Sequence, residues 1–170
     1  MMTRLILWLA VLVLGIHIGA AVYEMVVITP LWAGNPPASV RGFNPVADFA
    51  IEPLSYKRPA IIVLAVTAFG LLSVGSRRGA GRAWSLLAGA IVLALAAATV
   101  LHAFPILRRT IGTNGAGLSD LQIVEHVNAW LLWSRVRVAG LALAWAAAVA
   151  ALVQLYTRPE RGFRSNLRWK

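Results

Sequence analysis

The 170-residue sequence has no cysteine and few charged residues. Without cysteine it forms no disulfide, no thiol redox pair, no iron–sulfur cluster and no cysteine-ligated zinc or haem site. Quinone-linked thiol chemistry is excluded for the same reason. Only 13% of the residues are charged and 59% are hydrophobic. This balance excludes a water-soluble enzyme and indicates that the apolar runs lie in a lipid bilayer.

Acidic residues are the scarcest charged type, with 6 Asp and Glu against 16 Lys and Arg and a net charge of +10. In a soluble chain this excess would indicate nucleic-acid binding, but here the basic residues lie mostly at the edges of apolar segments. We therefore interpret them as topology signals. The expected partner is the lipid bilayer, and no nucleic acid is expected.

Four apolar runs are candidates for helices that cross the bilayer, because about 20 residues at 1.5 Å per residue span its roughly 30 Å core. They cover residues 5–28, 60–74, 83–104 and 133–156. The expected fold class is an all-α membrane protein, a four-transmembrane-helix bundle. It forms a single domain over residues 1–156, followed by a basic cytoplasmic tail over 157–170.

The first run resembles a secretory signal peptide in part. Arg4, the apolar stretch Leu5–Leu14 and the small residues 19–21 imitate its three regions. The apolar sequence then resumes at Met25 instead of ending. We therefore expect an uncleaved first helix.

The segments between the spans carry their own signals. Residues 29–59 hold six of the eight prolines, which predicts a long Pro-rich first loop, ordered or partly helical. Pro105 is expected to end the third helix. Ser119 followed by Gln122 fits a capping box that begins an extended fourth helix. Its first part, residues 120–132, should lie in or above the membrane interface.

The basic residues also predict an orientation. Arg4, the Gly-rich turn at 75–82 and the tail at 157–170 concentrate positive charge on the side that holds both termini. Cytoplasmic segments carry the excess of Lys and Arg in membrane proteins. We expect an integral protein of the bacterial inner (cell) membrane with both termini in the cytoplasm.

Three ionisable residues within or near the spans should lie at one height. At 1.5 Å per residue, Glu24 and Arg137 are each about 28 Å from the inner ends of their helices, and His102 is about 30 Å from its inner end. Ionisable groups are costly in a bilayer and mark functional or pairing sites. An acid, a base and a fixed cation from three helices form a candidate pocket for a hydrophobic small molecule. Glu24, His102 and Arg137 are the candidate catalytic residues.

Further side chains share the faces of these three. His17 lies two turns before Glu24 on one face of the first helix, and Tyr23 adjoins Glu24. A single stripe of the fourth helix carries His126, Trp130, Trp133 and Arg137. The candidate substrate-binding residues are His17, Tyr23, His126, Trp130 and Trp133.

Each candidate has a structural alternative. Glu24 and Arg137 can form an ion pair that only fixes helix register. His102 can cap a carbonyl at a helix end, and His17 can be a neutral side chain bonded to a neighbouring helix. The two tryptophans of the stripe can belong to the aromatic belt, and His126 can be solvated.

Metal binding has little support in the sequence. No His-x-x-His, His-Glu-x-x-His or Glu-x-x-His pair occurs. His17 should also lie about 10 Å deeper than Glu24. We assign no metal site, and the cofactor and the oligomeric state stay undetermined.

Several segments resemble a known family. They are Val22–Trp32, Asn35-Pro36-Pro37, Phe104-Pro105 and Trp130-x-x-Trp133-Ser134-Arg135-Val136-Arg137. Together they resemble the small four-helix membrane family of unknown function that includes the fungal anthrone oxygenases, over most of residues 5–156. The matching positions are Glu24, Pro105, Trp133 and Arg137. The chain departs from the Asn-Val-Pro-Leu-Asn-like stretch, where it reads Ala103–Leu107, and from the His-x-Arg-like triplet, where it reads Arg135-Val136-Arg137.

The resemblance implies oxygenation of an electron-rich polycyclic aromatic compound without an evident cofactor. In this interpretation Glu24 is the base, Arg137 or a histidine stabilises the enolate oxygen, and the carbanion reacts with O2. His102 is an alternative base or a proton shuttle. The alternative function is a non-catalytic membrane protein that binds a lipid or hydrophobic ligand or serves as an assembly subunit.

Overall fold

The computed structural model describes residues 2–44, 57–77, 79 and 81–157. Throughout this part the chain is helical with short turns and has no strand. The helical elements, with η marking a π-helical segment, are α1 (Met2–Tyr23), η1 (Glu24–Ile28), α2 (Thr29–Ala33), α3 (Ala38–Gly42), α5 (Lys57–Ser76), α6 (Arg82–Ala98), η2 (Thr99–Ala103), α7 (Phe104–Thr110) and α8 (Asp120–Thr157). Residues 45–56 of the Pro-rich first loop and residues 158–170 of the basic tail lie outside the described residues.

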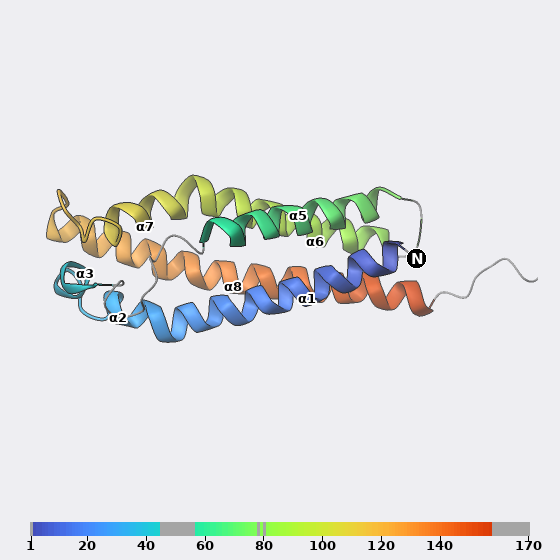
Figure 1. Cartoon of the computed structure of the whole chain (residues 1–170), viewed down its shortest axis with the longest axis horizontal. Helices are drawn as coiled ribbons and strands as arrows, with labels where there is room; N and C mark the ends of the chain where they lie inside the picture. Colours follow the sequence, from blue (N-terminus) through green and yellow to red (C-terminus); the bar gives the residue numbers. More distant parts are fainter. Residues whose placement is uncertain (1, 45–56, 78, 80, 158–170) are drawn as a thin grey trace, which may run out of the picture.

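Four helical stretches are long and apolar enough to cross a bilayer, which confirms the expected all-α four-helix membrane fold. They are Met2–Ala33, Pro59–Ser76, Arg82–Thr110 and Asp120–Thr157. Successive stretches run in opposite directions, so that α1 begins and α8 ends at the same end of the bundle (Figure 1). We call this the terminal end, and the opposite end, with α2, α3 and α7, the cap end.

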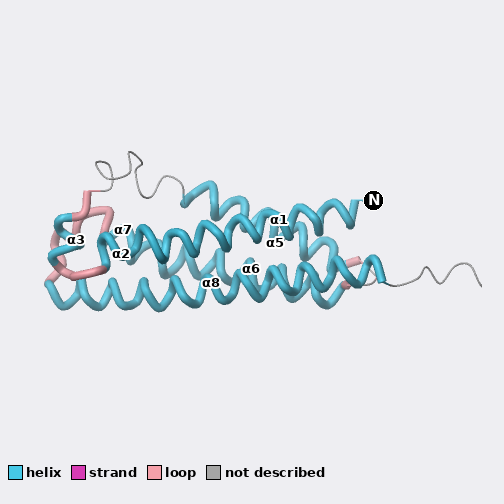
Figure 2. The backbone as a smooth tube through the Cα atoms, turned by 90° about the horizontal axis from the view of Figure 1, so that it is seen from below, coloured by secondary structure: helices cyan, strands magenta, loops and turns pink. Residues whose placement is uncertain are grey.

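The spans differ in length, and α5 is the short one. Its 20 residues correspond to about 30 Å, the thickness of the hydrocarbon core, whereas the 38 residues of α8 correspond to about 57 Å. In both views α5 stops well before the cap end, while the other three stretches continue (Figures 1 and 2). Among the described residues, three of the four stretches therefore continue on the side of the cap.

Small residues bring the helices of the bundle close together. A Cβ at Gly89 of α6 would lie 2.8 Å from Leu72 and 3.1 Å from the carbonyl oxygen of Ala68, both on α5. Ala144 and Ala148 of α8 are fully buried in the same core. Close backbone approach of this kind stabilises helix pairs in lipid, where van der Waals packing replaces the hydrophobic effect.

A separate hydrophobic core fills the cap end, beyond the start of α5. Its buried members come from α2, α3 and the residue that follows α3, η2, α7, the turn that follows α7, and the first turns of α8. They are Trp32, Val40, Phe43, Ala103, Leu107, Ile111, Ile123, Val127 and Trp130. The part of the first loop that the structure describes thus folds onto α7 and α8.

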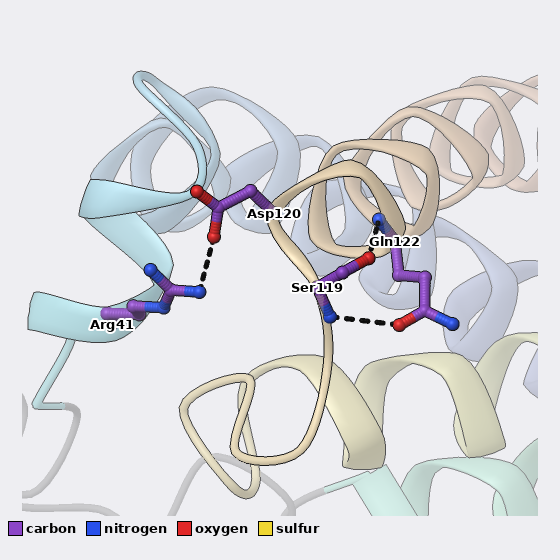
Figure 3. A network of polar contacts seen from close by, with 4 residues as sticks. All are labelled: Arg41, Ser119, Asp120 and Gln122. Carbon is purple, nitrogen blue, oxygen red and sulfur yellow. Dashed lines mark hydrogen bonds and ion pairs between the residues drawn. The ribbon is translucent and has the colours of Figure 1, made fainter.

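The expected capping box begins α8 within this cap (Figure 3). The backbone N–H of Ser119 donates to Oε1 of Gln122 at 2.9 Å, and the N–H of Gln122 donates to Oγ of Ser119 at 3.3 Å. Asp120 of the same turn forms an exposed ion pair with Arg41 of α3. The reciprocal bonds satisfy two amides at the start of α8, and the ion pair joins that start to the first loop.

The two helices that run towards the cap end are interrupted in the same way. Both α1 and α6 pass into a five-residue π-helical segment, η1 or η2. Proline is the second residue after each segment, Pro30 in α2 and Pro105 in α7. The structure therefore differs from the expectation that Pro105 ends the third helix, because helical structure continues to Thr110.

The π-helical turns explain how both helices continue. In an α-helix the proline ring collides with the carbonyl four residues earlier. After η2 the N–H of Phe104 donates to the carbonyl of Thr99, five residues back, and Thr29 bonds to Glu24 in the same way after η1. The wider turn moves the carbonyls away from the ring, so the helix bends instead of ending.

Candidate functional site

The first and last spans are joined by a buried ion pair at the cap side of the bundle. Nη2 of Arg137 donates to Oε2 of Glu24 at 2.8 Å, and the side chains are 13% and 11% exposed. Glu24 is the first residue of η1, where α1 ends, and Arg137 lies in the middle part of α8. The two residues expected at one height therefore do meet across the bundle.

Aromatic rings lie against the pair on the side of the cap. The guanidinium carbon of Arg137 lies 5.8 Å from the centroid of the Trp130 ring, within the range of a cation–π contact. Trp130 in turn packs against Trp32 of α2, with centroids 6.3 Å apart and planes tilted by 52°. Both rings are buried, so the guanidinium lies between a carboxylate and an apolar wall.

A cavity of about 280 Å³ opens beside the pair. Five of its lining residues carry polar atoms or an indole: His17, Glu24, Thr99, Trp130 and Arg137. The remaining lining residues are apolar, namely Ile16, Ala20, Ala21, Ala60, Ile61, Leu64, Phe104, Leu107 and Leu141. The volume falls just below the roughly 300–1,000 Å³ typical of ligand pockets. One small, largely apolar molecule fits this space, with its polar atoms at the charged pair.

The position of the cavity follows from the lengths of the helices. Ala60, Ile61 and Leu64 come from the first turns of α5, the short helix of the bundle. The polar residues that begin the two π-helical segments, Glu24 and Thr99, line the cavity from the other helices. In the part of the chain that the structure describes, the cavity thus lies where α5 begins and three helical stretches continue beyond it. Two of these three stretches pass from α-helical to π-helical winding at this level.

His17 lines the inner part of the cavity and connects two helices. Its Nε2 lies 3.3 Å from the carbonyl oxygen of Ala60 on α5, and its Nδ1 lies 2.9 Å from that of Val13 on its own helix. The ring is half-buried between these two acceptors. A neutral imidazole carries one N–H and donates to one of these two carbonyls at a time, so His17 bridges α1 and α5 at the cavity wall in the tautomer that is protonated on Nε2.

Other predicted residues lie elsewhere. His102 is exposed in η2 and is not among the lining residues, and Tyr23 is 54% exposed on α1. His126 packs in the cap, where its Nδ1 lies 3.1 Å from Oγ1 of Thr110. Trp133 is half-buried against both cores and does not line the cavity. The structure therefore brings Glu24, Arg137, His17 and Trp130 together at the cavity. The four residues described in this paragraph lie apart from that group.

Thr99, Phe104 and Leu107 line the cavity although they were not predicted from the sequence as site residues. A sequence signal was present, because Thr99 precedes Pro105 by the same interval as Glu24 precedes Pro30. A polar residue six positions before a proline thus marks both cavity-lining π-helical segments.

The described residues contain no group of three or more His, Asp or Glu side chains that could hold a metal ion. Within this part of the chain, the acid nearest to the cavity is already bound to an arginine. Comparison of the chain with protein-family models, curated proteins and solved structures finds no match.

Proposed function

We propose that this integral membrane protein binds a small hydrophobic molecule in the cavity beside Glu24 and Arg137, with an oxygen acceptor of the molecule at the charged pair. One observation carries the proposal: a buried ion pair forms part of the wall of a largely apolar space. An ion pair that served only to fix helix register would need no space beside it.

The interrupted helices support the same location. Single-turn π-helical segments occur frequently at functional sites. Here the first residues of η1 and η2, Glu24 and Thr99, both line the cavity.

A binding measurement tests this proposal. The probe is 1,4-naphthoquinone, a flat apolar ring with two carbonyl acceptors that quenches tryptophan fluorescence; the chain has no thiol with which it could react. In phosphatidylcholine vesicles, wild type should show saturable quenching. The double variant Glu24→Gln, Arg137→Gln should bind at least about tenfold more weakly, because a charged donor is lost.

The exposed pair of the cap provides the matched control. The double variant Asp120→Asn, Arg41→Gln removes the same two charges far from the cavity and should bind like wild type. Quenching that stays linear with probe concentration in the wild type contradicts the proposal. Equal affinities of the two double variants contradict the role of the pair.

A second candidate function is oxygenation, as in the anthrone oxygenases that parts of the sequence resemble. The observation that favours it is the presence of a carboxylate and a guanidinium in the wall of one cavity. Glu24 accepts the proton from the activated carbon of an anthrone-type compound, and Arg137 stabilises the enolate oxygen. The enolate carbon forms a bond to O2, the resulting peroxide anion takes the proton back from Glu24, and the hydroperoxide then loses water to give the quinone.

Oxygen uptake distinguishes this function from binding alone. One O2 should be consumed for each anthrone converted to anthraquinone and water, above the rate of the vesicles without protein. Glu24→Gln should lower this excess rate by about 100-fold, as expected for loss of a general base. Asp120→Asn should leave it unchanged. Saturable binding without excess oxygen uptake contradicts the oxygenase and retains the binding function.

For the location we propose the bacterial inner membrane, with both termini in the cytoplasm. Arg4, Arg77 and Arg82 lie at the terminal end of the bundle, and in the sequence Arg78 and the basic residues after Thr157 directly adjoin the segments that end there. Cytoplasmic flanks of membrane spans are enriched in Lys and Arg. The cap and the cavity then lie towards the outer face.

A further inference from the structure

The geometry points to a lateral entrance: the ligand reaches the cavity from the bilayer, through an opening between α1 and α5. This inference rests on the proposed binding function and names the route and the class of ligand for the same site. The class is a bilayer-dissolved ring compound with a carbonyl or hydroxyl oxygen, small enough for a cavity of about 280 Å³.

Exposed residues line the cavity on one side. Ile16 is 70% exposed and Ala20 is also exposed, and both contribute to the wall. They lie on α1 within the apolar stretch that crosses the membrane. A wall made of exposed apolar residues at this depth meets acyl chains and not water. The cavity is therefore open towards the lipid at Ile16 and Ala20.

The packing between α1 and α5 is less extensive than the packing of either helix against its main partner. The helix α5 packs mainly against α6, and α1 packs mainly against α8. Across the opening from α1, Ile61 of α5 is half-buried and lines the same cavity. The helix α5 begins only four residues before Ile61. Closer to the cap end, α1 therefore has no described helix beside it on the side that faces α5.

His17 holds the two sides of the opening together. Its bond to the Ala60 carbonyl connects α1 to the first turn of α5, next to Ile16 and within one turn of Ala20. The bond is a single one, 3.3 Å long, between a side chain and a backbone oxygen. A molecule that passes between the helices has to displace or bypass this bond in addition to the packing contacts between α1 and α5. His17 therefore contributes to how readily the opening widens.

The walls select the ligand. A molecule that arrives from the hydrocarbon core meets apolar side chains first and the charged pair of Glu24 and Arg137 at the inner wall. Its apolar body then stays near the entrance, while its oxygen accepts a hydrogen bond at the pair. The volume suits one small ring system and not a whole phospholipid.

The rates of binding test this route. Stopped-flow tryptophan quenching by 1,4-naphthoquinone in phosphatidylcholine vesicles measures association and dissociation. Ala20→Phe places a ring in the opening, and both rate constants should fall about tenfold while the dissociation constant changes less than about threefold. Gly19→Phe is the matched control, because Gly19 is exposed, has open space around its Cβ position and does not line the cavity. It should match wild type.

A second variant acts in the opposite direction. His17→Leu removes the bridge to Ala60, and both rate constants should rise. Unchanged rates in His17→Leu overturn the role of the bridge. An unchanged association rate constant in Ala20→Phe overturns the lateral entrance. Weaker binding with faster dissociation in this variant also overturns it, because the phenylalanine ring then occupies the cavity and does not obstruct the entrance. Absence of saturable quenching in the wild type overturns the proposed function itself.

Discussion

Arg137 and Glu24 are separated by 113 positions in the sequence, yet Nη2 of one lies 2.8 Å from Oε2 of the other. The bond joins α8 to the end of α1 in a region that excludes most water. Removal of one member leaves an uncompensated charge, which costs more than loss of the bond alone. The pair therefore makes the relative height of the first and last spans specific.

Glu24→Gln and Arg137→Gln should each lower the free energy of unfolding by about 3 kcal/mol. The double variant should cost less than either single one, because no unpaired charge remains. The measurement is reversible unfolding by SDS in mixed micelles, followed by far-ultraviolet circular dichroism. Arg41→Gln, which breaks the exposed pair with Asp120, should cost less than about 1 kcal/mol. Additive costs of the two buried substitutions would show that the charges act independently.

The pairing of Glu24 with Arg137 could be predicted because both helices are regular up to these residues. Counting from the terminal end at 1.5 Å per residue gives both side chains the same height. Residue type then indicates a contact, since an isolated charge at that depth is costly. The four spans could be predicted for a similar reason, because helix length and bilayer thickness match.

The position of His102 could not be predicted by counting residues along the helix axis. The distance along the axis gives its height, but its direction depends on the winding of η2. In this π-helical segment Thr99 and the following Phe104 line the cavity, whereas His102 is exposed beside Leu101, which is 68% exposed. The period of an α-helix does not apply across such a segment. The packing of the first loop on α7 could not be predicted either, because its residues lack a regular hydrophobic period.

Gly81 should be intolerant of any side chain. It has a φ of +79°, and a Cβ would lie 2.6 Å from the carbonyl oxygen of Ala151 on α8. Its N–H also donates to Oε1 of Gln154 at 3.0 Å, so the turn between α5 and α6 is fastened to α8. Gly81→Ala should lower the free energy of unfolding by about 2 kcal/mol, from backbone strain and the collision together.

Gly79 of the same turn is the control for this substitution. It has no atom within 4 Å of its Cβ position, so Gly79→Ala should change stability by less than about 0.5 kcal/mol. Thermal unfolding of both variants in one detergent provides the comparison. Equal melting temperatures for the two variants would show that the turn moves away from Ala151 without cost.

His126 should carry its proton on Nδ1 when the ring is neutral. The hydroxyl of Thr110 donates its only hydrogen to the carbonyl of Ile106 at 2.8 Å, so it can only accept from Nδ1 of His126 at 3.1 Å. Nitrogen-15 NMR of histidine-labelled protein in micelles identifies the tautomer. A neutral ring protonated on Nε2 would contradict this arrangement.

The same contact predicts a stability effect in the cap. Thr110→Val keeps the volume of the side chain but removes the acceptor, and should cost about 1 kcal/mol. Thr113→Val is the control, because the Thr113 hydroxyl is exposed and bonds only to the Arg109 carbonyl. Hydrogen exchange should become faster at the amides of α7 in the first variant and stay unchanged in the second.

The orientation in the membrane can be measured without background, because the natural chain has no cysteine. Thr113→Cys places a thiol in the exposed turn of the cap, and Ser76→Cys places one at the exposed end of α5 beside Arg77. With both termini in the cytoplasm, a membrane-impermeant maleimide should label Thr113→Cys in spheroplasts. It should label Ser76→Cys only after the membrane is permeabilised. The reverse pattern would place the basic terminal end outside and the cavity near the cytoplasmic face. Labelling of both thiols in sealed spheroplasts would show a mixed orientation and would contradict a single orientation set by the basic residues at the terminal end.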